Sequence, residues 1–262
     1  VIAGWDGMRH IRKATRKTDK VLLDFGKYTI FTLIGTNLLR SADTLIISLS
    51  PLGTAAVALY SIPMKLTELQ QIPLRSFVAT AFPKMSKASI QGKIGEVKEL
   101  FYTYSGAMTY LLAGISLVTF VFADVFVLVL GGKQYLGVDP ITGANTADIV
   151  RIFSVYGLLL PIDRMAGAGL DSINKPDRNF QKVMYMAITN IIGDLIAVFL
   201  FKSLAMVAFA SIVFTLLGIW VGYYFLNRQL SLEFRNIFTS GFRFYQSMYE
   251  KFINAGKPFK TT

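Results

Sequence analysis

Long apolar stretches recur along the 262-residue chain and decide its structural class. Six of these stretches are long enough to cross a membrane, since a helix needs about 20 residues to span a hydrocarbon core of about 30 Å. The pattern predicts an all-α integral membrane protein whose six transmembrane helices form one bundle over residues 28–230. The predicted spans are residues 28–49, 54–81, 104–130, 149–170, 183–201 and 204–226.

The charges between these spans predict the orientation of the bundle. Basic residues accumulate on the cytoplasmic side of a membrane because they resist translocation. The segment before the first span, the loops after the second and fourth spans, and the tail hold 20 of the 27 lysines and arginines. The opposite loops hold only Lys133 and Lys202. Both ends of the chain, residues 1–27 and 231–262, are therefore predicted to be cytoplasmic.

A formal net charge of +11 is also typical of proteins that bind nucleic acid. Here the charge alternates from loop to loop, whereas a nucleic-acid surface gathers it on one face of the fold. The distribution therefore favours membrane lipids, and not nucleic acid, as the partner of these side chains. The chain has no cysteine. Its lone His10 lies among basic loop residues, where we expect a solvated side chain and no metal site.

Polar residues inside the predicted spans are the most informative positions. An ionisable group in a span usually faces the interior of a bundle or a water-filled cavity, because contact with lipid is costly. Spacings of three, four and seven residues place each set on one helical face. Four spans carry such stripes: Asn37, Arg40 and Asp43; Ser61, Lys65, Glu68 and Arg75; Arg151, Ser154, Pro161 and Arg164; and Asn190 and Asp194.

Two interpretations of these stripes are open. In the first, charges pair within their own helices and serve only to hold the helices together. The pairs would be Arg40 with Asp43, Lys65 with Glu68, and Arg151 with Asp148. Alternatively, the stripes line a hydrated cavity with a cationic bias, suited to a phosphate or pyrophosphate group. Arg75 favours the cavity because no acidic residue lies within one helical turn of it. Its position near the cytoplasmic end of the span also allows its side chain to reach the membrane interface.

Several runs of sequence resemble one known family. They are Arg40-Ser-Ala-Asp43-Thr-Leu-Ile-Ile, Ala58-Leu-Tyr60-Ser-Ile-Pro63-Met-Lys65-Leu-Thr-Glu68-Leu, Phe82-Pro83-Lys84-Met-Ser86-Lys87 and Leu170-Asp-Ser-Ile-Asn174-Lys-Pro176. In order and spacing they resemble the polysaccharide exporter or oligosaccharide (O-antigen) flippase family. This family belongs to the multidrug, oligosaccharidyl-lipid and polysaccharide exporter (MOP) superfamily. The likeness covers about residues 20–230.

The resemblance implies an architecture and a function. Members of the family have two bundles of six helices with the substrate path between them. By this likeness the chain is the C-terminal lobe, and residues 1–27 connect it to a missing N-terminal lobe. The beginning Val-Ile-Ala-Gly-Trp, without an initiator Met, likewise predicts a fragment. The implied function is to flip a polyprenyl-pyrophosphate-linked oligosaccharide across the bacterial inner membrane, for surface polysaccharide such as the O-antigen of lipopolysaccharide.

The polar stripes and the resemblance together predict the substrate-binding residues. We expect four cations, Arg40, Lys65, Arg75 and Arg164, to hold the anionic pyrophosphate. The complete predicted set is Asn37, Arg40, Asp43, Lys65, Glu68, Arg75, Arg164, Asn190 and Asp194.

Other functions remain as alternatives. Within the superfamily these are a lipid II type flippase and a multidrug extruder, although an extruder of cationic drugs is expected to carry unpaired acids. A fragment of a membrane glycosyltransferase or polymerase is the enzymatic alternative, but the non-cytoplasmic loops are short for a catalytic surface. Gly131-Gly132-Lys133 lacks the earlier Gly and the following Ser or Thr of an ATP-binding loop. We predict no catalytic residue, no cofactor and no metal.

The tail after residue 231 has a different pattern. Aromatic residues recur at steps of three and four, while charged residues such as Arg235, Arg243 and Lys251 occupy the other side. This periodicity predicts an amphipathic helix that either lies in the cytoplasmic membrane interface or packs on the loops of the bundle. The aromatic positions are Phe234, Phe238, Phe242, Tyr245, Tyr249 and Phe252.

Overall fold

The structure, a computed structural model, describes residues 16–139 and 142–255. In these ranges the chain is helical almost throughout, which confirms the all-α prediction. A 3-10 helix at Lys133–Tyr135 and a π-helical turn at Ile196–Leu200 accompany the α-helices. The α-helices are α2 (Arg16–Ser48), α3 (Gly53–Ile90), α4 (Ile94–Val121), α5 (Ala123–Gly131), α6 (Thr146–Ser172), α7 (Pro176–Leu195), α8 (Leu204–Leu230) and α9 (Phe234–Ala255). The ends of the predicted connection and tail, residues 1–15 and 256–262, lie outside the described residues.

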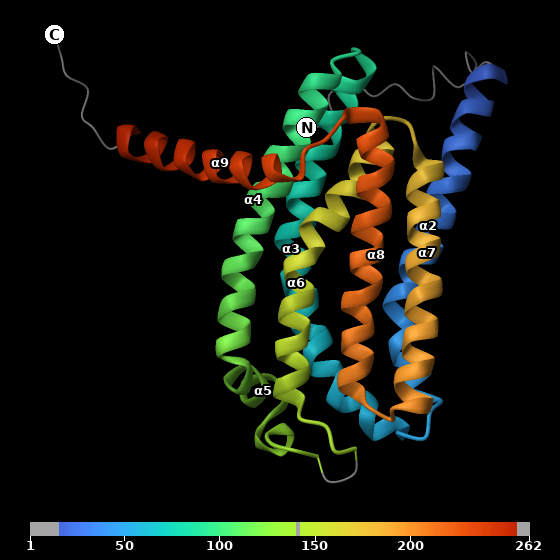
Figure 1. Ribbon diagram of the computed structural model, residues 1–262, viewed down its shortest axis with the longest axis vertical. Helices are drawn as coiled ribbons and strands as arrows, with labels where there is room; N and C mark the ends of the chain where they lie inside the picture. Colours follow the sequence, from blue (N-terminus) through green and yellow to red (C-terminus); the bar gives the residue numbers. More distant parts are fainter. Residues whose placement is uncertain (1–15, 140–141, 256–262) are drawn as a thin grey trace, which may run out of the picture.

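The long helices run between the same two ends of the molecule, and α9 leaves the bundle crosswise (Figure 1). Helix α6 packs against α3, α4 and α8, while α7 packs along α2 and α8. Helix α2 lies against α7 over most of its length and touches α3 over a much shorter stretch. This partial separation of α2 from α3 leaves room inside the bundle.

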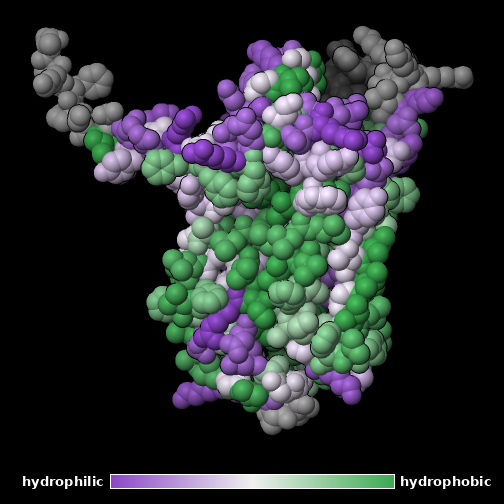
Figure 2. Space-filling view, viewed as in Figure 1, coloured by the Kyte–Doolittle hydropathy of each residue, from purple (hydrophilic) through white to green (hydrophobic). Residues whose placement is uncertain are grey.

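Hydropathy divides the long helices into two groups. Among the described residues, four segments are long and apolar enough to cross a membrane: Leu22–Ser48, Ile94–Val121, Pro176–Leu200 and Leu204–Leu230. Helices α3 and α6 are long as well, but they carry more charged residues. Apolar side chains form a broad belt around the middle of the molecule, and hydrophilic ones cover the end where α9 begins (Figure 2). The chain is therefore a membrane protein, although the uniform set of six apolar helices that the sequence predicts is not matched in detail.

The helix boundaries differ from the predicted spans at several points. The predicted span 104–130 is divided between α4 and α5, which meet at Phe122. Helix α2 includes residues 16–27, so the described part of the predicted connection is helical. Helix α7 begins at Pro176, whose fixed φ suits a first helical position, with Asp177 in the first turn near the positive helix end. These helices continue beyond the apolar stretches because their first turns tolerate charged side chains.

Two apolar clusters hold the bundle together near its opposite ends. The first joins α3, α4, α6 and α8 through Met85, Phe101, Met165, Leu170 and Leu226. The second includes Ile47, Tyr60, Ile149, Val198 and Leu204. These residues are buried, and their dispersion contacts fix the helices against one another at both ends.

Small residues let α6 and α8 approach closely at the first cluster. A Cβ atom on Gly222 of α8 would lie 2.9 Å from the Cβ atom of Ala166 on α6. Such small residues are typical of helix interfaces in membranes. The close α6–α8 seam therefore forms a rigid wall behind the space that lies between α2 and α3.

Candidate substrate cavity

A cavity of about 740 Å³ opens between the helices where α2 and α3 separate. Residues of α2, α3, α6, α7 and α8 line it. Leu33 lines the cavity and is still 57% exposed, so the cavity reaches the outer surface of α2. The lining combines apolar side chains such as Phe153 and Phe214 with several charged ones. This combination suits a ligand that has both a charged and an apolar part.

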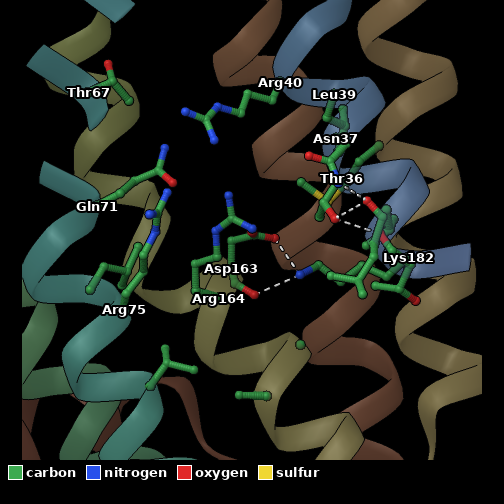
Figure 3. Close-up of a pocket in the computed structure, with 18 of the residues that line it drawn as sticks. Thr36, Asn37, Leu39, Arg40, Thr67, Gln71, Arg75, Asp163, Arg164 and Lys182 are labelled. Atoms are coloured by element: carbon green, nitrogen blue, oxygen red, sulfur yellow. Dashed lines mark hydrogen bonds and ion pairs between the residues drawn. The ribbon is translucent and has the colours of Figure 1, made fainter. Parts of the chain in front are cut away.

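Three arginines from three different helices face this cavity. Arg40 of α2, Arg75 of α3 and Arg164 of α6 all line it, and their guanidinium groups point toward the same space (Figure 3). Arg40 forms an ion pair with Glu68 of α3. In the part of the chain that the structure describes, neither Arg75 nor Arg164 has an ion-pair or hydrogen-bond partner. Unneutralised guanidinium groups inside a membrane bundle favour an anionic ligand.

A buried ion pair closes the cavity on its α6–α7 side. The Lys182 Nζ lies 2.6 Å from the Asp163 Oδ1, and it also donates a hydrogen bond of 2.7 Å to the Asp163 carbonyl oxygen. Both side chains are about 95% buried, and both residues line the cavity. Nearby, the Asn179 side-chain amide donates to the Asp171 carboxylate at 2.8 Å. Lys182 and Asp163 therefore neutralise each other, and the Asp171 carboxylate is bonded to a neutral amide.

Sequence reasoning missed this pair. Lys182 was expected in the loop between the fourth and fifth spans, and this expectation is wrong, because α7 already begins at Pro176. The signal was present in the sequence: a proline followed by an acidic residue is typical of the first helical turn. A helix that begins at this proline carries Lys182 almost two turns inside, where it faces α6.

A second polar cluster lies deeper, between α2, α3 and α7. The Asn190 side-chain amide donates to Asp43 at 3.1 Å and to Asp194 at 3.2 Å, and the Tyr60 hydroxyl donates to Asp43 at 2.9 Å. All four side chains are buried. In the described residues neither Asp43 nor Asp194 forms an ion pair with a basic group. The two buried carboxylates therefore share the neutral amide of Asn190 and have no counter-charge among the described residues.

The predicted helix pairs need correction. Arg151 does pair with Asp148, as predicted, at 2.6 Å, and it also binds Asp124 of α5 at 2.6 Å. The other two predicted pairs are wrong, because Arg40 binds Glu68 across α2 and α3 instead of Asp43. Lys65 consequently has no partner among the described residues.

The nine predicted site residues occupy three kinds of position. Asn37, Arg40, Asp43, Glu68, Arg75 and Arg164 line the cavity. Asn190 and Asp194 are fully buried behind the cavity wall, where they reach Asp43. Lys65 is exposed and does not line the cavity. Glu68 and Arg75 are seven residues apart, which is nearly two whole turns of α3, so they share one face of the helix. Lys65 is three residues before Glu68, and its side chain is therefore rotated by about 60° away from that of Glu68.

Comparison with known proteins points to one family and one fold. The profile of a family described as polysaccharide biosynthesis protein matches residues 8–140, just over half of the chain. No curated protein matches the chain.

Two solved structures of MOP superfamily transporters are similar to the chain. One is an outward-facing multidrug resistance transporter of the MATE family, with a TM-score of 0.56, 14% identity and coverage of 86% of this chain and 50% of that one. The other, from Pyrococcus furiosus, was described with a binding pocket of reverse polarity that suggests a different function. Its TM-score is 0.54 at 14% identity, over 87% of this chain and 52% of that one. The likeness establishes the fold, and the chain spans about half the length of these structures.

Proposed function

Because the chain belongs to the polysaccharide biosynthesis protein family, we propose that it is the C-terminal lobe of a flippase for polyprenyl-pyrophosphate-linked oligosaccharides. Its place is the bacterial inner membrane, with both ends of the chain in the cytoplasm and a surface polysaccharide such as O-antigen as the product of the pathway. The similarity to about half of each two-lobed transporter supports the assignment to one lobe. The missing N-terminal lobe then supplies the other wall of the substrate path.

The observation that carries this proposal is the convergence of Arg40, Arg75 and Arg164 on one cavity. A pyrophosphate offers several anionic oxygens, and planar guanidinium groups bind such oxygens with paired hydrogen bonds. Two of the three arginines are free to bind because the described residues give them no partner. Lys65, which the sequence placed in the same group, has no part in this site.

The opening of the cavity suits a ligand that remains attached to a lipid. The exposed Leu33 lies in the cavity lining, where α2 and α3 are apart. A polyprenyl chain can stay in the surrounding bilayer at this rim while its charged head occupies the cavity. A cationic drug fits this cavity less well, because Asp43 and Asp194, which have no basic partner among the described residues, are buried and bonded to Asn190, whereas the unpaired Arg75 and Arg164 face the cavity. A lipid II type flippase shares the pyrophosphate and differs only in the sugar.

The proposal is tested in the full-length protein, in a host whose surface polysaccharide depends on it. Arg75→Ala and Arg164→Ala are expected to reduce surface polysaccharide by tenfold or more, since each removes a charge-assisted contact worth about 1.5–3 kcal/mol. Arg75→Lys retains the charge and should lose less. Lys65→Ala is the matched control, because it removes a cation from the same helix outside the cavity.

Immunoblots of isolated membranes must show equal amounts of every variant. Polysaccharide at the level of the unchanged protein in both Arg75→Ala and Arg164→Ala would exclude the cavity as the pyrophosphate site. Loss in Lys65→Ala equal to that in Arg75→Ala would also contradict it, because the effect would then follow from overall charge.

A further inference from the structure

Helix α9 is the one long helix of the described chain that does not join the bundle (Figure 1). It leaves the end of α8 crosswise to the other helices, and only its first half lies against α4. Its apolar residues recur along one side, as the sequence predicts, but α4 covers only part of that side. Phe238, Phe242, Met248, Tyr249 and Ile253 remain exposed.

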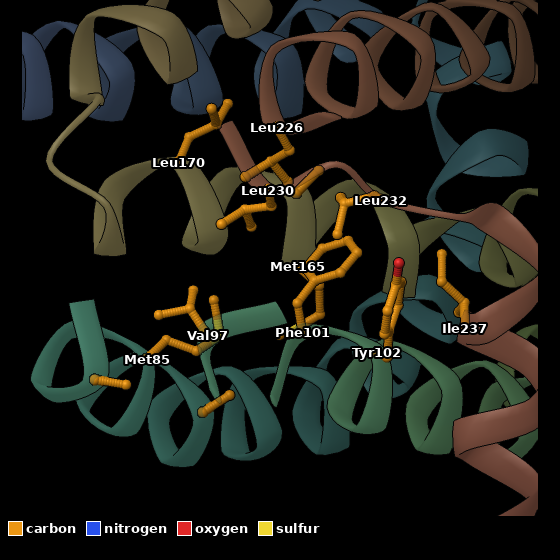
Figure 4. Packing of buried hydrophobic residues seen from close by; sticks show 13 residues of the cluster. Met85, Val97, Phe101, Tyr102, Met165, Leu170, Leu226, Leu230, Leu232 and Ile237 are labelled. Carbon is orange, nitrogen blue, oxygen red and sulfur yellow. The ribbon is translucent and has the colours of Figure 1, made fainter. Parts of the chain in front are cut away.

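The contact with α4 is short and close. Gly106 of α4 and Gly241 of α9 touch backbone to backbone, so that a Cβ atom on Gly241 would come within 2.7 Å of the Gly106 Cα. The Tyr245 hydroxyl donates a hydrogen bond of 2.9 Å to the Ala107 carbonyl oxygen. Ile237 is fully buried in the apolar cluster that contains Phe101 (Figure 4). These contacts fix the position of α9 along α4.

The turn between α8 and α9 fixes the direction of the helix. Ser231 adopts a left-handed conformation with φ of 49° and ends α8. The Asn227 side-chain oxygen accepts from the Leu232 amide at 2.6 Å, and the Tyr102 hydroxyl accepts from the Glu233 amide at 2.6 Å. The chain is therefore turned sharply out of the bundle by bonds to α8 and α4.

The crossing point lies at the depth of a membrane interface. Helix α4 carries its last charge at Glu99 and has no charged residue from 100 to 123. Gly106 is seven residues beyond Glu99, about 10 Å along the helix at 1.5 Å per residue. Amphipathic helices that bind membrane surfaces bury their apolar face about 5–10 Å into the boundary between headgroups and acyl chains. The α4 contact thus holds α9 at that level.

From these observations we infer that α9 is an in-plane helix that binds the anionic phospholipids of the leaflet at this end of the bundle. Phe242 and Tyr249 lie on one face of the helix, and their side chains enter the acyl region. The opposite face carries Ser240, Ser247 and Lys251, and Arg243 lies between the two faces. Hydrophobic residues gather on the side of α9 that faces the apolar belt of the bundle (Figure 2).

Charge complementarity decides the kind of lipid. The basic residues Arg235 and Arg243 are exposed on α9, and Lys84, Lys87 and Lys93 line a hollow at the turn between α3 and α4. Lysines and arginines near a membrane surface are attracted by the negative potential of anionic headgroups. The surface of α9 therefore fits phosphatidylglycerol or cardiolipin better than a zwitterionic lipid.

The depth and the orientation of α9 are measured by site-directed spin labelling of the full-length protein in phosphatidylglycerol vesicles. Single cysteines replace Phe242 and Tyr249 on the apolar face, and Ser240 and Ser247 on the opposite, polar face. Oxygen partitions into lipid, and a water-soluble nickel chelate stays outside. We expect the oxygen-to-nickel collision ratio to be several-fold higher at 242 and 249 than at 240 and 247. Equal ratios on both faces would overturn the inference.

A second outcome would also overturn it. Labels at 242 and 249 that neither oxygen nor nickel reaches would mean that protein, and not lipid, covers this face. The role of charge is tested with the triple variant Arg235→Gln, Arg243→Gln, Lys251→Gln, which should lose any difference in label depth between phosphatidylglycerol and phosphatidylcholine vesicles. The control Lys133→Gln, Lys202→Gln removes charges from the opposite end and should keep that difference. The same depth for the unchanged protein in both lipids would contradict anionic selectivity.

Discussion

Lys182 of α7 and Asp163 of α6 form an ion pair that is almost completely closed to solvent, with 2.6 Å between Nζ and Oδ1. The lysine also binds the Asp163 carbonyl oxygen, so that the pair joins both the side chain and the backbone of α6 to α7. Arg164, the next residue along α6, has no such partner and faces the cavity. Asp163 thus joins α6 to α7, whereas the adjacent Arg164 faces the cavity.

Removing one member of the buried pair should destabilise the bundle. Lys182→Met leaves the Asp163 carboxylate buried without a counter-charge, and such losses cost about 3–5 kcal/mol. We expect a lower thermal unfolding midpoint in detergent, measured by the fluorescence of a thiol-independent reporter or by circular dichroism. The double variant Lys182→Met, Asp163→Leu should recover much of the loss, because no buried charge remains. Lys175→Met, which removes an exposed lysine from the preceding turn, serves as control, and an equal effect there would contradict the assignment.

The ion pair between Arg40 and Glu68, unlike the buried pair, should contribute little to the stability of the bundle. Its side chains are 57% and 46% exposed, and exposed pairs contribute about 0–1 kcal/mol to stability. Glu68→Gln is expected to leave the unfolding midpoint nearly unchanged while it releases a third arginine into the cavity. Calorimetric titration with inorganic pyrophosphate should then show several-fold tighter binding. Glu96→Gln breaks the exposed pair with Lys93 outside the cavity and should not change the affinity. Weaker binding in Glu68→Gln would mean that Glu68 orients Arg40 for the ligand.

The presence of apolar helices and the polar stripes on them could be predicted from the sequence, because both depend on local spacing. Six of the predicted site residues line the cavity, and their role in substrate binding stays a prediction: Asn37, Arg40, Asp43, Glu68, Arg75 and Arg164. The partners of these residues could not be predicted in the same way. Arg40 and Glu68 are 28 residues apart, and their contact depends on how α2 lies against α3.

The other errors in the sequence-based prediction concern the residues at which helices begin and end. Hydropathy ends a predicted helix where the apolar residues end, whereas a real helix continues as long as its backbone bonds and caps allow. Lys182 was therefore assigned to a loop, and the break at Phe122 within an apolar run was not detected. The cavity itself follows from the separation of α2 from α3, which no local pattern records.

Asn190 should be essential to the cluster of Asp43 and Asp194. Its amide donates to both carboxylates, and Asn190→Leu removes both hydrogen bonds while the acids remain buried. Loss of a buried donor costs about 1–3 kcal/mol, so the unfolding midpoint should fall. Asp194→Asn removes one of the two like charges and supplies a new donor, and its midpoint should equal or exceed that of the unchanged protein. A stable Asn190→Leu variant would be evidence against this bonding, and Asn236→Leu on the surface of α9 gives the baseline.

The crossing of Gly106 and Gly241 should tolerate no side chain on either residue. A Cβ atom on Gly241 meets the backbone of Gly106, which has no flexible end that can move aside. Gly241→Ala is therefore expected to separate α9 from α4, at a cost of about 1–3 kcal/mol for the overpacked contact. Trypsin should then cleave at Arg235 and Arg243 faster than in the unchanged protein in detergent, while the bundle stays resistant. Gly114→Ala is the matched control on α4, since a Cβ atom there meets nothing within 4 Å. Equal cleavage rates for Gly241→Ala and Gly114→Ala would show that the contact between the two glycines does not hold α9 against α4.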